Sequence, residues 1–457
     1  MLLYYNCNKT NITMANKNDF STTFLKVGMK YKNAEKIVNY LIDKNITLSG
    51  TVLLAMIGSK QMYEILIKKC SSNTKIIIAD SKLVTYYFNN KKNITCVTIK
   101  ENDADDFYNK LKNMPKFDFI VQNPPYNGSL HLDFLNKGFE MLNKNGQMII
   151  IEPAMWLINL NENSEYNTGK RGNLTPQIKS NIKGHVKKVI IENYNKEFNV
   201  SLFVPFSITH IDMGNTYNEI TYKLCGIENI VNTIDNCNII GDINIIKSIL
   251  NKVRMFDVVK NHLYKPNKSI KIEGNYYTKY TQLIGRGGVI QGQSGQLHLN
   301  SFYNKLPFGD YAWIYTCSLY ANKFNGVFEN VPKGLKSGCH NGELSDKDAN
   351  CITGTQSELE NWYYYVFNNK LPLFLNLCIS IDQNNTVLPY VPWLVDKKYT
   401  DQEIYDMFNF TDAEIKLIET TIKKFERNSP WFKRYMCGPS AATDEEVQKF
   451  IEDLNNA

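Results

Sequence analysis

The sequence predicts an α/β fold with a parallel sheet and helices on both of its faces. Between about residues 23 and 215, short continuous apolar runs alternate with segments of helical periodicity, as in repeated strand–helix units. Most of these runs lack polar alternation, which is typical of parallel strands that are buried on both faces. Apolar residues make up 43% of the 457 residues and charged residues 21%, so the chain can bury a sizeable core.

Seven strands are predicted, and each is a short run rich in apolar or β-branched residues. In chain order they are TVLLAMIG (51–58), KIIIAD (75–80), ITCVTI (94–99), FDFIVQ (117–122), QMIIIEP (147–153), KKVIIEN (187–193) and VSLFVPFSITHI (200–211). Helices are expected at QMYEILIKKC (61–70) and LDFLNKGFEMLNK (132–144), the second closed by Asn145-Gly146. Residues 216–260 are expected to form a bridge that contains one helix, INIIKSILNKV (243–253).

Changes in composition and in the pattern of apolar residues divide the chain into three parts. They are a flexible segment (1–22), the α/β domain (23–240) and a second domain (241–457). Residues from about 261 to 395 are rich in Tyr, Trp, Asn and Gly, and the second domain is expected to be mixed α/β. Two helices near its end are predicted by the capping boxes that begin at Thr400 and Thr411. Its aromatic stretch NWYYYVF is predicted to lie in the core and not to serve as a platform for stacking bases.

Charge and cysteine usage limit the classes of partner and compartment. The net charge of +7 fits a polyanionic partner without proving one. The ten cysteines form no CxxC pairs, and only Cys339 has a neighbouring histidine, His340, so free thiols in a reducing, cytoplasmic compartment and no metal site are expected. No run of about 18 apolar residues occurs, so no membrane span is expected.

The tetrapeptide Asn123-Pro124-Pro125-Tyr126 directly follows the fourth predicted strand. In open α/β sheets, ligands bind beyond the carboxyl ends of the strands. Two consecutive prolines remove two N–H donors, so the loop presents carbonyl oxygens and the Asn123 side chain as acceptors. Acceptors on both hydrogens of an aromatic amine direct its lone pair at an electrophile, and Tyr126 offers a flat face to a flipped base. The alternative is a Pro-Pro turn that only closes a strand.

NPPY after FDFIVQ is similar to the catalytic motif of amino methyltransferases, which act on adenine and less often on cytosine or protein glutamine. The order of the parts, with a long region after the NPPY half, resembles gamma-class, TaqI-like DNA adenine-N6 methyltransferases of phage and restriction–modification systems. Named motifs cover about residues 25–215, and the likeness is looser over residues 390–419. The resemblance implies a Rossmann-like methyltransferase domain, a C-terminal target-recognition domain, S-adenosylmethionine as cofactor and double-stranded DNA as partner.

The family's binding residues carry over to matching positions. Asp80, at the tip of the second strand, matches the acid that holds the ribose hydroxyls of the cofactor, and the alternative is a plain loop aspartate. For the aspartate that contacts the cofactor adenine, Asp106 is the first choice and Asp103 the second; the alternative is a solvated acidic helix start. Phe198 resembles the aromatic residue that flanks the flipped base, and the alternative is a core phenylalanine.

The first cofactor motif departs from the family pattern. In VLLAMIGSK (52–60), Gly58 remains and lets the backbone approach a cofactor closely, but Leu54 replaces a common acidic residue and Lys60 a second glycine. This departure keeps open a catalytically silent methyltransferase-fold protein that binds DNA. Methylation of RNA or of a protein glutamine is a further alternative, and the long C-terminal region argues against glutamine.

Residues 284–300 combine glycines with side chains that can read bases. Glutamine pairs bidentately with adenine and arginine with guanine in the major groove, and glycines let a loop enter a groove. The candidate DNA-binding residues are Arg286, Gln291, Gln293 and Gln296. The alternative is a glycine-rich hairpin with exposed polar side chains.

Overall fold

The computed structural model describes two long stretches of the chain and short strand segments between them. The described residues are 38–39, 42, 46–58, 60–100, 102–126, 130–158, 174–198, 205–258, strand segments between 263 and 353, 356–379, 391–426 and 428–456. They belong to two compact units. The first comprises the described parts of Met1–Trp156, Asn163–Cys237 and Cys437–Pro439, and the second those of Leu157–Glu162, Asn238–Met436 and Ser440–Ala457.

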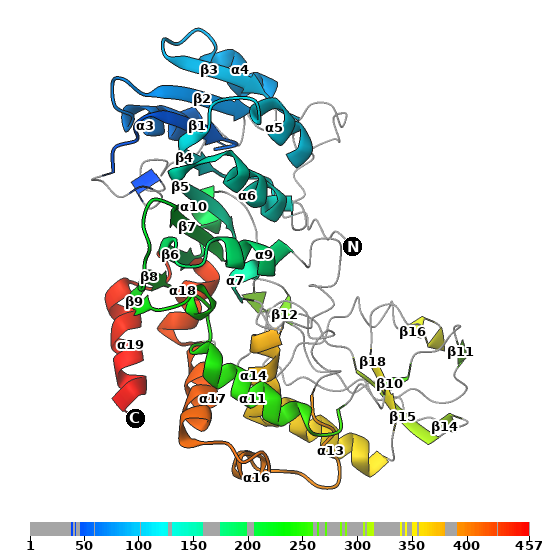
Figure 1. Ribbon diagram of the computed structural model, residues 1–457. Helices are drawn as coiled ribbons and strands as arrows, with labels where there is room; N and C mark the ends of the chain where they lie inside the picture. The colour runs from blue at the N-terminus through cyan, green and yellow to red at the C-terminus, as the bar shows by residue number, and fades with distance from the viewer. Residues whose placement is uncertain are drawn as a thin grey trace. The chain divides into compact units, whose positions relative to one another are not determined.

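A nine-stranded sheet, in the order β3-β2-β1-β4-β5-β7-β6-β8-β9, forms the centre of the first unit (Figure 1). Its strands are β1 (Thr51–Ala55), β2 (Lys75–Asp80), β3 (Ile94–Thr98), β4 (Phe117–Gln122), β5 (Leu142–Pro153), β6 (Val186–Glu192), β7 (Phe206–Asp212), β8 (Ile220–Leu224) and β9 (Ile227–Val231). The five strands from β3 to β5 are parallel, whereas β7 runs antiparallel to both β5 and β6. The predicted Rossmann-like α/β sheet is thus confirmed, but the expectation of a parallel sheet is wrong beyond β5, where β7 and β9 run antiparallel to their neighbours.

The order of the strands locates the place where a ligand would bind. From β1 the chain adds β2 and β3 on one side, and it then returns to place β4 and β5 on the other side. In doubly wound sheets this switch point opens a crevice beyond the carboxyl ends of the two central strands. The residues that follow β1 and β4 are therefore the first to consider as a site.

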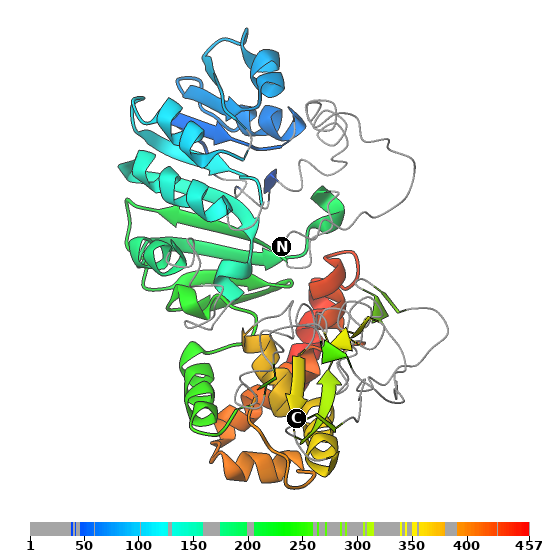
Figure 2. The ribbon, with the colours of Figure 1, turned by 90° about the vertical axis from the view of Figure 1, so that its right-hand side faces the viewer.

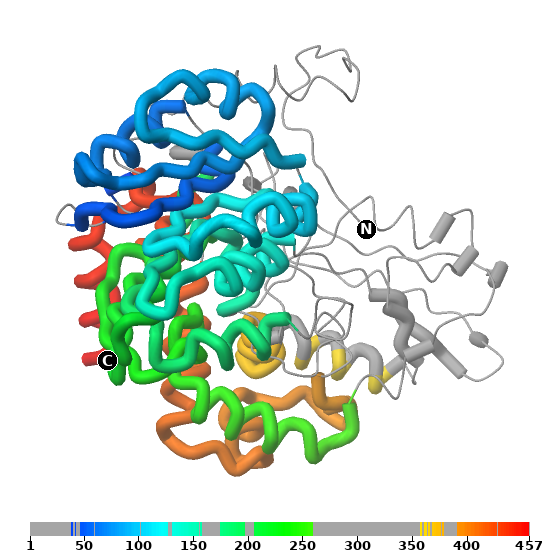
Figure 3. The backbone as a smooth tube through the Cα atoms, turned by 45° about the horizontal axis from the view of Figure 1, so that its top comes forward, coloured from blue at the N-terminus to red at the C-terminus, as the bar shows by residue number. Residues whose placement is uncertain are grey.

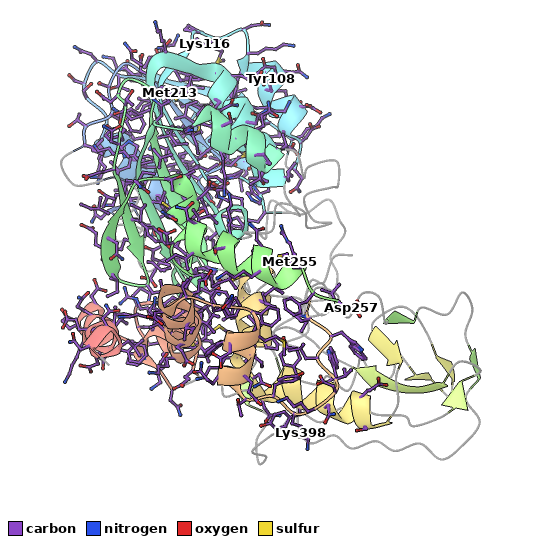
Figure 4. All side chains as sticks on the ribbon, turned by 60° about the horizontal axis from the view of Figure 1, so that its bottom comes forward. Tyr108, Lys116, Met213, Met255, Asp257 and Lys398 are labelled. Carbon is purple, nitrogen blue, oxygen red and sulfur yellow. The ribbon has the colours of Figure 1, made fainter. Side chains whose placement is uncertain are left out.

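Helices cover both faces of the sheet (Figure 2). They are α3 (Lys60–Lys68), α4 (Lys82–Phe88), α5 (Ala104–Leu111), α6 (Leu130–Met141), α9 (Leu174–Asn181) and α10 (Asn195–Phe198), and the single-turn helix α7 (Met155–Ile158) follows β5 at the boundary of the unit. One hydrophobic cluster joins α3 and α4 to alternate residues of the strands, such as Leu54 and Ile78. On the opposite face α6 packs so closely that a Cβ at Gly138 would lie 2.9 Å from the Met148 side chain. Side chains fill the space between the sheet and its helices (Figure 4).

Two expectations about local structure are wrong. The helix expected to reach residue 144 ends at Met141, because Leu142 already pairs with Phe117 of β4 and opens β5. Residues 216–231, expected to be a bridge, contribute β8 and β9 to the sheet. Their two-residue turn places Cys225 and Gly226 at φ values of 47° and 88°. Tight hairpins require such positive angles, but Cys-Gly is not the usual Asn-Gly signal.

The second unit combines helices with short antiparallel strand pairs. Its helices are α11 (Ile243–Arg254), α13 (Gln356–Asn368), α14 (Lys370–Ile379), α16 (Asp401–Met407), α17 (Asp412–Lys424), α18 (Pro430–Cys437) and α19 (Asp444–Asn456). Its strands are β10 (Leu263–Tyr264), β11 (Ile270–Lys271), β12 (Ile284–Gly285), β13 (Gly288–Val289), β14 (Lys305–Leu306), β15 (Gly309–Ile314), β16 (Cys339–His340), β17 (Glu343–Leu344) and β18 (Asn350–Thr353). Both predicted capping boxes are confirmed, at Thr400 and Thr411.

The helices of the second unit share a core. Trp362 and Tyr365 of α13 are fully buried, which agrees with the prediction that this aromatic stretch lies in the core. Helix α11 lies alongside α17 (Figure 3), and Lys252 Nζ lies 2.6 Å from Glu414 Oε2 between them. Within the described residues, no helix is both apolar enough and long enough for a membrane span.

Candidate active site

The NPPY loop begins at the carboxyl end of β4, where the sequence places it. Strand β4 lies between β1 and β5, and the backbone N–H of Asn123 donates to the carbonyl of Ala55, the last residue of β1, at 3.1 Å. This hydrogen bond carries the pairing of the two central strands one residue beyond the end of β4. Asn123 therefore lies at the switch point of the sheet.

Two neighbours fix the orientation of the Asn123 amide. Asn123 Nδ2 lies 3.4 Å from the carbonyl oxygen of Ile57, in the loop after β1. Because a carbonyl only accepts hydrogen bonds, the amide nitrogen must face Ile57 and the oxygen must face the other way. The Tyr126 hydroxyl donates to this oxygen. An amide oxygen has two lone pairs, so Asn123 Oδ1 can accept a second hydrogen bond while its orientation stays fixed.

The ring of Tyr126 is braced from β7. It is partly buried and meets the ring of Phe206 edge-on, with centroids 5.8 Å apart and an interplanar angle of 65°. Phe206 is fully buried. Phe198, the other predicted base-stacking residue, ends α10, and its side chain lies outside the described part of the chain. The stacking roles of both residues remain predictions.

The loop after β1, where the first cofactor motif is predicted, makes a tight turn. Gly58 has a φ of +85°, a conformation that side-chain-bearing residues rarely adopt, and Met56 also has a positive φ, of +51°. A Cβ built on Gly58 would lie 3.5 Å from Asn123 Nδ2, so the loop after β1 and the NPPY loop are neighbours. Lys60 is half exposed, and its ammonium lies 4.0 Å from the centre of the Tyr87 ring. The ammonium group of Lys60, which stands where the family has a second glycine, therefore contacts a residue of α4.

Asp80 ends β2 beside the loop after β1, and it is almost fully buried. Its Oδ1 accepts from the backbone N–H of Ser81 at 2.6 Å, and its Oδ2 accepts from the hydroxyl of Tyr63 at 2.5 Å. That hydroxyl also accepts from the backbone N–H of Ile57 at 3.2 Å. The predicted ribose-binding acid is therefore in place at the carboxyl edge of the sheet, and Tyr63 connects it to the first loop.

The two acidic candidates after β3 shape the start of α5. Asp103 is its N-cap and accepts from the backbone N–H of Asp106 at 2.8 Å. Asp106 accepts from Lys110 Nζ at 2.9 Å and from the backbone N–H of Lys100 at 2.8 Å. The hydrogen bond from Lys110 holds the pKa of Asp106 below its usual value. Both carboxylates thus organise the segment after β3, and their contact with a cofactor adenine stays a prediction.

Glu152 is a buried acid that the sequence analysis did not select. It is fully buried near the end of β5, two residues beyond Ile150, which pairs with the last residue of β4. Among the described residues, neither of its carboxylate oxygens has a hydrogen-bond partner. Burial raises the pKa of Glu152 well above its usual range; the Trp156 indole N–H opposes this but does not reach hydrogen-bond geometry. A charged residue in the otherwise apolar run IIIEP was the signal available in the sequence.

The structure thus brings Gly58, Asp80 and the NPPY loop together at the carboxyl ends of three adjacent strands. It adds Tyr63, for which the sequence held no signal, since a tyrosine on the apolar side of a helix is commonly a core residue. The candidate base-reading residues Arg286, Gln291, Gln293 and Gln296 lie outside the described residues. Within the described part of the chain, no group of three or more His, Cys, Asp or Glu side chains is arranged to hold a metal.

Comparison with known proteins gives no family for this chain. No family model matches it, and no curated protein matches its sequence. Among solved structures it is similar to TrmN from Thermus thermophilus, with 14% identity, a TM-score of 0.27, and 42% of this chain and 52% of TrmN covered. Thus the match spans about half the length of TrmN.

Two further solved structures are similar over a comparable part of the chain. A SAM-dependent methyltransferase from Aquifex aeolicus has 15% identity and a TM-score of 0.27, with 42% of this chain and 97% of that chain covered. The M protein of the type I restriction enzyme EcoKI has 11% identity and a TM-score of 0.29, with 38% and 44% covered. Likeness at this level concerns the fold, so the function has to be argued from the site.

Proposed function

We propose that this chain is an S-adenosylmethionine-dependent methyltransferase that modifies the exocyclic amine of adenine in double-stranded DNA. The observation that carries the proposal is the aimed amide of Asn123. Its oxygen is turned away from the Ile57 carbonyl, at the carboxyl end of β4 and at the switch point of the sheet. An acceptor fixed in this way suits an amine that must be oriented before it can react.

The residues around the loop after β1 fit the cofactor. When bound, S-adenosylmethionine supplies an electrophilic methyl group on a sulfonium. Gly58 would allow the backbone to approach it, and Asp80 would accept hydrogen bonds from the ribose hydroxyls. Asp106, or in its place Asp103, would contact the cofactor adenine. Lys60 is held over the ring of Tyr87, so its charge would already be engaged there when a cofactor binds.

The NPPY loop then holds the substrate amine. Flipping the target adenine out of the duplex costs about a few kcal/mol, part of which stacking on Tyr126 recovers. Asn123 Oδ1 and the Pro124 carbonyl accept the two amine hydrogens, and Pro125 contributes no competing N–H. Bound S-adenosylmethionine would supply the methyl group to the lone pair that these two acceptors orient, and S-adenosylhomocysteine would be the leaving group. The resulting ammonium is acidic and releases its proton to solvent.

Cofactor titration and methyl transfer test this proposal together. We expect calorimetric binding of S-adenosylmethionine to the full chain, and transfer of its labelled methyl group to the adenine N6 position of duplex DNA. Absence of binding at millimolar cofactor, with and without DNA, would leave a catalytically silent methyltransferase-fold DNA-binding protein. Label recovered in RNA or in protein glutamine, and not in DNA, would show that the substrate is wrong.

The role of Asp80 predicts a specific loss of affinity. Asp80→Ala removes the acceptor of the ribose hydroxyls and should weaken binding of S-adenosylmethionine by roughly 1.5–3 kcal/mol, the range for a hydrogen bond to a charged group. Asp105→Ala is the matched control, because Asp105 is exposed on α5 and pairs with Lys137. Equal cofactor affinities of the two variants, with folding intact in both, would remove Asp80 from the site.

Residues 284–300 are predicted to carry sequence specificity. Replacing them with a Gly/Ser segment of equal length should relax site selection more than it weakens nonspecific DNA binding, because base contacts specify and phosphate contacts position. Within this segment the structure describes two short strands, β12 and β13, which pair with each other. Competition between specific and random duplexes at one fixed salt concentration measures both effects. Unchanged selection after the exchange would place the reading surface elsewhere.

A further inference from the structure

A chain of hydrogen bonds connects the carboxyl ends of β1, β2 and β4. It runs from Asn123 Nδ2 to the Ile57 carbonyl, and again from the Ile57 backbone N–H to the Tyr63 hydroxyl at 3.2 Å. The Tyr63 hydroxyl then donates to Asp80 Oδ2 at 2.5 Å. Tyr63 therefore stands between the loop after β1 and the acid at the tip of β2, and it bonds to both.

The chemistry of Tyr63 fixes the direction of this chain. Burial raises the pKa of its phenol well above the ordinary value, and the negative charge of Asp80 raises it further. The phenol consequently keeps its proton and has one O–H to donate. The carboxylate of Asp80 accepts the hydrogen bond from that O–H, and a lone pair of the phenol oxygen accepts the hydrogen bond from the backbone N–H of Ile57. The hydroxyl satisfies a backbone donor and a carboxylate at once, and such linked bonds strengthen one another.

Packing holds the hydroxyl in place. Tyr63 is fully buried in α3, and its ring lies 5.5 Å from the ring of Phe88 in α4. On the other side of the carboxylate, Ser81 donates its backbone N–H to Asp80 Oδ1 at 2.6 Å. One fixed donor on each oxygen prevents rotation of the Asp80 carboxylate. A carboxylate offers about four acceptor positions, so binding a diol does not require Tyr63 to leave.

We infer that Tyr63 is a positioning residue for cofactor binding, which orients the Asp80 carboxylate toward the ribose diol and ties the loop after β1 to it. The inference rests on the proposed function, because it assumes an adenosine ligand at this edge of the sheet. Two geometrically fixed acceptor oxygens bind a cis-diol better than a rotating carboxylate, since no rotamer freedom is lost on binding. The side chain does not touch the reacting atoms.

The test compares two ligands in two proteins. S-adenosylhomocysteine and its 2′,3′-dideoxy analogue are titrated into the wild-type chain and into Tyr63→Phe, which keeps the ring and removes the hydroxyl. We expect Tyr63→Phe to weaken binding of S-adenosylhomocysteine roughly ten-fold or more, which corresponds to the low end of a charged hydrogen bond. The dideoxy analogue should lose less than about two-fold, because it has no diol for Asp80 to hold.

Tyr217→Phe is the matched control. Tyr217 also donates its hydroxyl to an acid, Asp212 at the end of β7, at 2.7 Å, but this pair lies at the opposite edge of the sheet and outside the chain of bonds. Its loss should leave both affinities unchanged. In case Tyr63→Phe folds poorly, Asp80→Asn provides a second measurement. This variant should bind S-adenosylhomocysteine more weakly, with little change for the dideoxy analogue.

The outcomes separate the inference from the proposed function. If the wild-type chain binds neither S-adenosylmethionine nor S-adenosylhomocysteine, the proposed function fails and the inference fails with it. If the wild-type chain binds both and Tyr63→Phe loses equal affinity for the diol and dideoxy ligands, Tyr63 only supports the fold. Tighter binding by Tyr63→Phe would mean that the hydroxyl competes with the ribose.

Discussion

Asn123→Ala is expected to reduce methyl transfer by roughly 10²–10³-fold, the size of effect seen when one preorganised polar group is removed from an active site. The variant lacks the oxygen that accepts an amine hydrogen, and the Tyr126 hydroxyl loses its acceptor. Cofactor affinity and DNA affinity should change little, because the side chain orients the nucleophile and contributes little to the core. Single-turnover transfer from labelled S-adenosylmethionine to duplex DNA, beside equilibrium titrations of both ligands, measures the difference.

A control variant separates the amide's position from its chemistry. Asn90→Ala removes the same side chain from an exposed turn, and its transfer rate should match that of the wild type. Asn123→Asp tests whether the amide nitrogen is needed to orient the side chain. It keeps an oxygen acceptor but replaces the nitrogen that faces the Ile57 carbonyl, so the carboxylate should turn away and activity should stay low. Wild-type transfer by Asn123→Ala would remove the NPPY mechanism.

Glu152→Gln is expected to stabilise the protein at neutral pH. Below a pH of about 4.5, the ordinary pKa of a glutamate, Glu152 is protonated both folded and unfolded. Above it the unfolded chain releases the proton while the folded chain keeps it, because burial raises the folded-state pKa. The free energy of unfolding of the wild type should therefore fall by about 1.4 kcal/mol per pH unit from this group until its folded-state pKa is reached.

Glutamine has nearly the same shape as glutamate and does not titrate, so the free energy of unfolding of Glu152→Gln lacks this decrease with pH. Urea unfolding of both proteins should give similar stabilities near about pH 4 and a gap that widens toward about pH 8. Glu219→Gln, at an exposed position, should follow the wild type throughout. Parallel curves for wild type and Glu152→Gln would mean that the Glu152 carboxyl is ionised in the folded protein and has a compensating partner.

The parts of the site that follow from local chemistry were predictable from the sequence. Asn123-Pro-Pro-Tyr after a buried strand, and Asp80 at the tip of another, fall where the periodicity of the sheet places them. Thr400 and Thr411 cap their helices because a capping box depends on residues three positions apart. In each case the relevant neighbours lie close in the sequence or follow from the order of strands.

The parts that were missed depend on partners distant in the sequence. Tyr63 has the spacing of a core residue, and only the approach of β2 gives its hydroxyl an acid to bind. The apolar residues of segment 216–231 are interspersed with polar ones and form no continuous run like those of the central strands, and the segment becomes strands because β6 offers an edge to β8. Leu142 leaves its helix because strand pairing with Phe117 competes with the helical turn. Each outcome is a tertiary preference that overrides a local one.

The placement of β4 between β1 and β5 also bears on how the protein folds. The contact of Asn123 with Ile57 joins residues 66 positions apart, and three helices (α3, α4, α5) and three strands (β2, β3, β4) lie between them. Parallel pairing of this kind closes a long loop before it gains any contact energy, and high contact order slows folding. The site should therefore be among the last features to appear during refolding, after hairpins such as β8–β9. Local separation of β1 from β4 would disrupt the predicted cofactor site and the NPPY loop together, because the two loops follow these two strands and are positioned by their pairing.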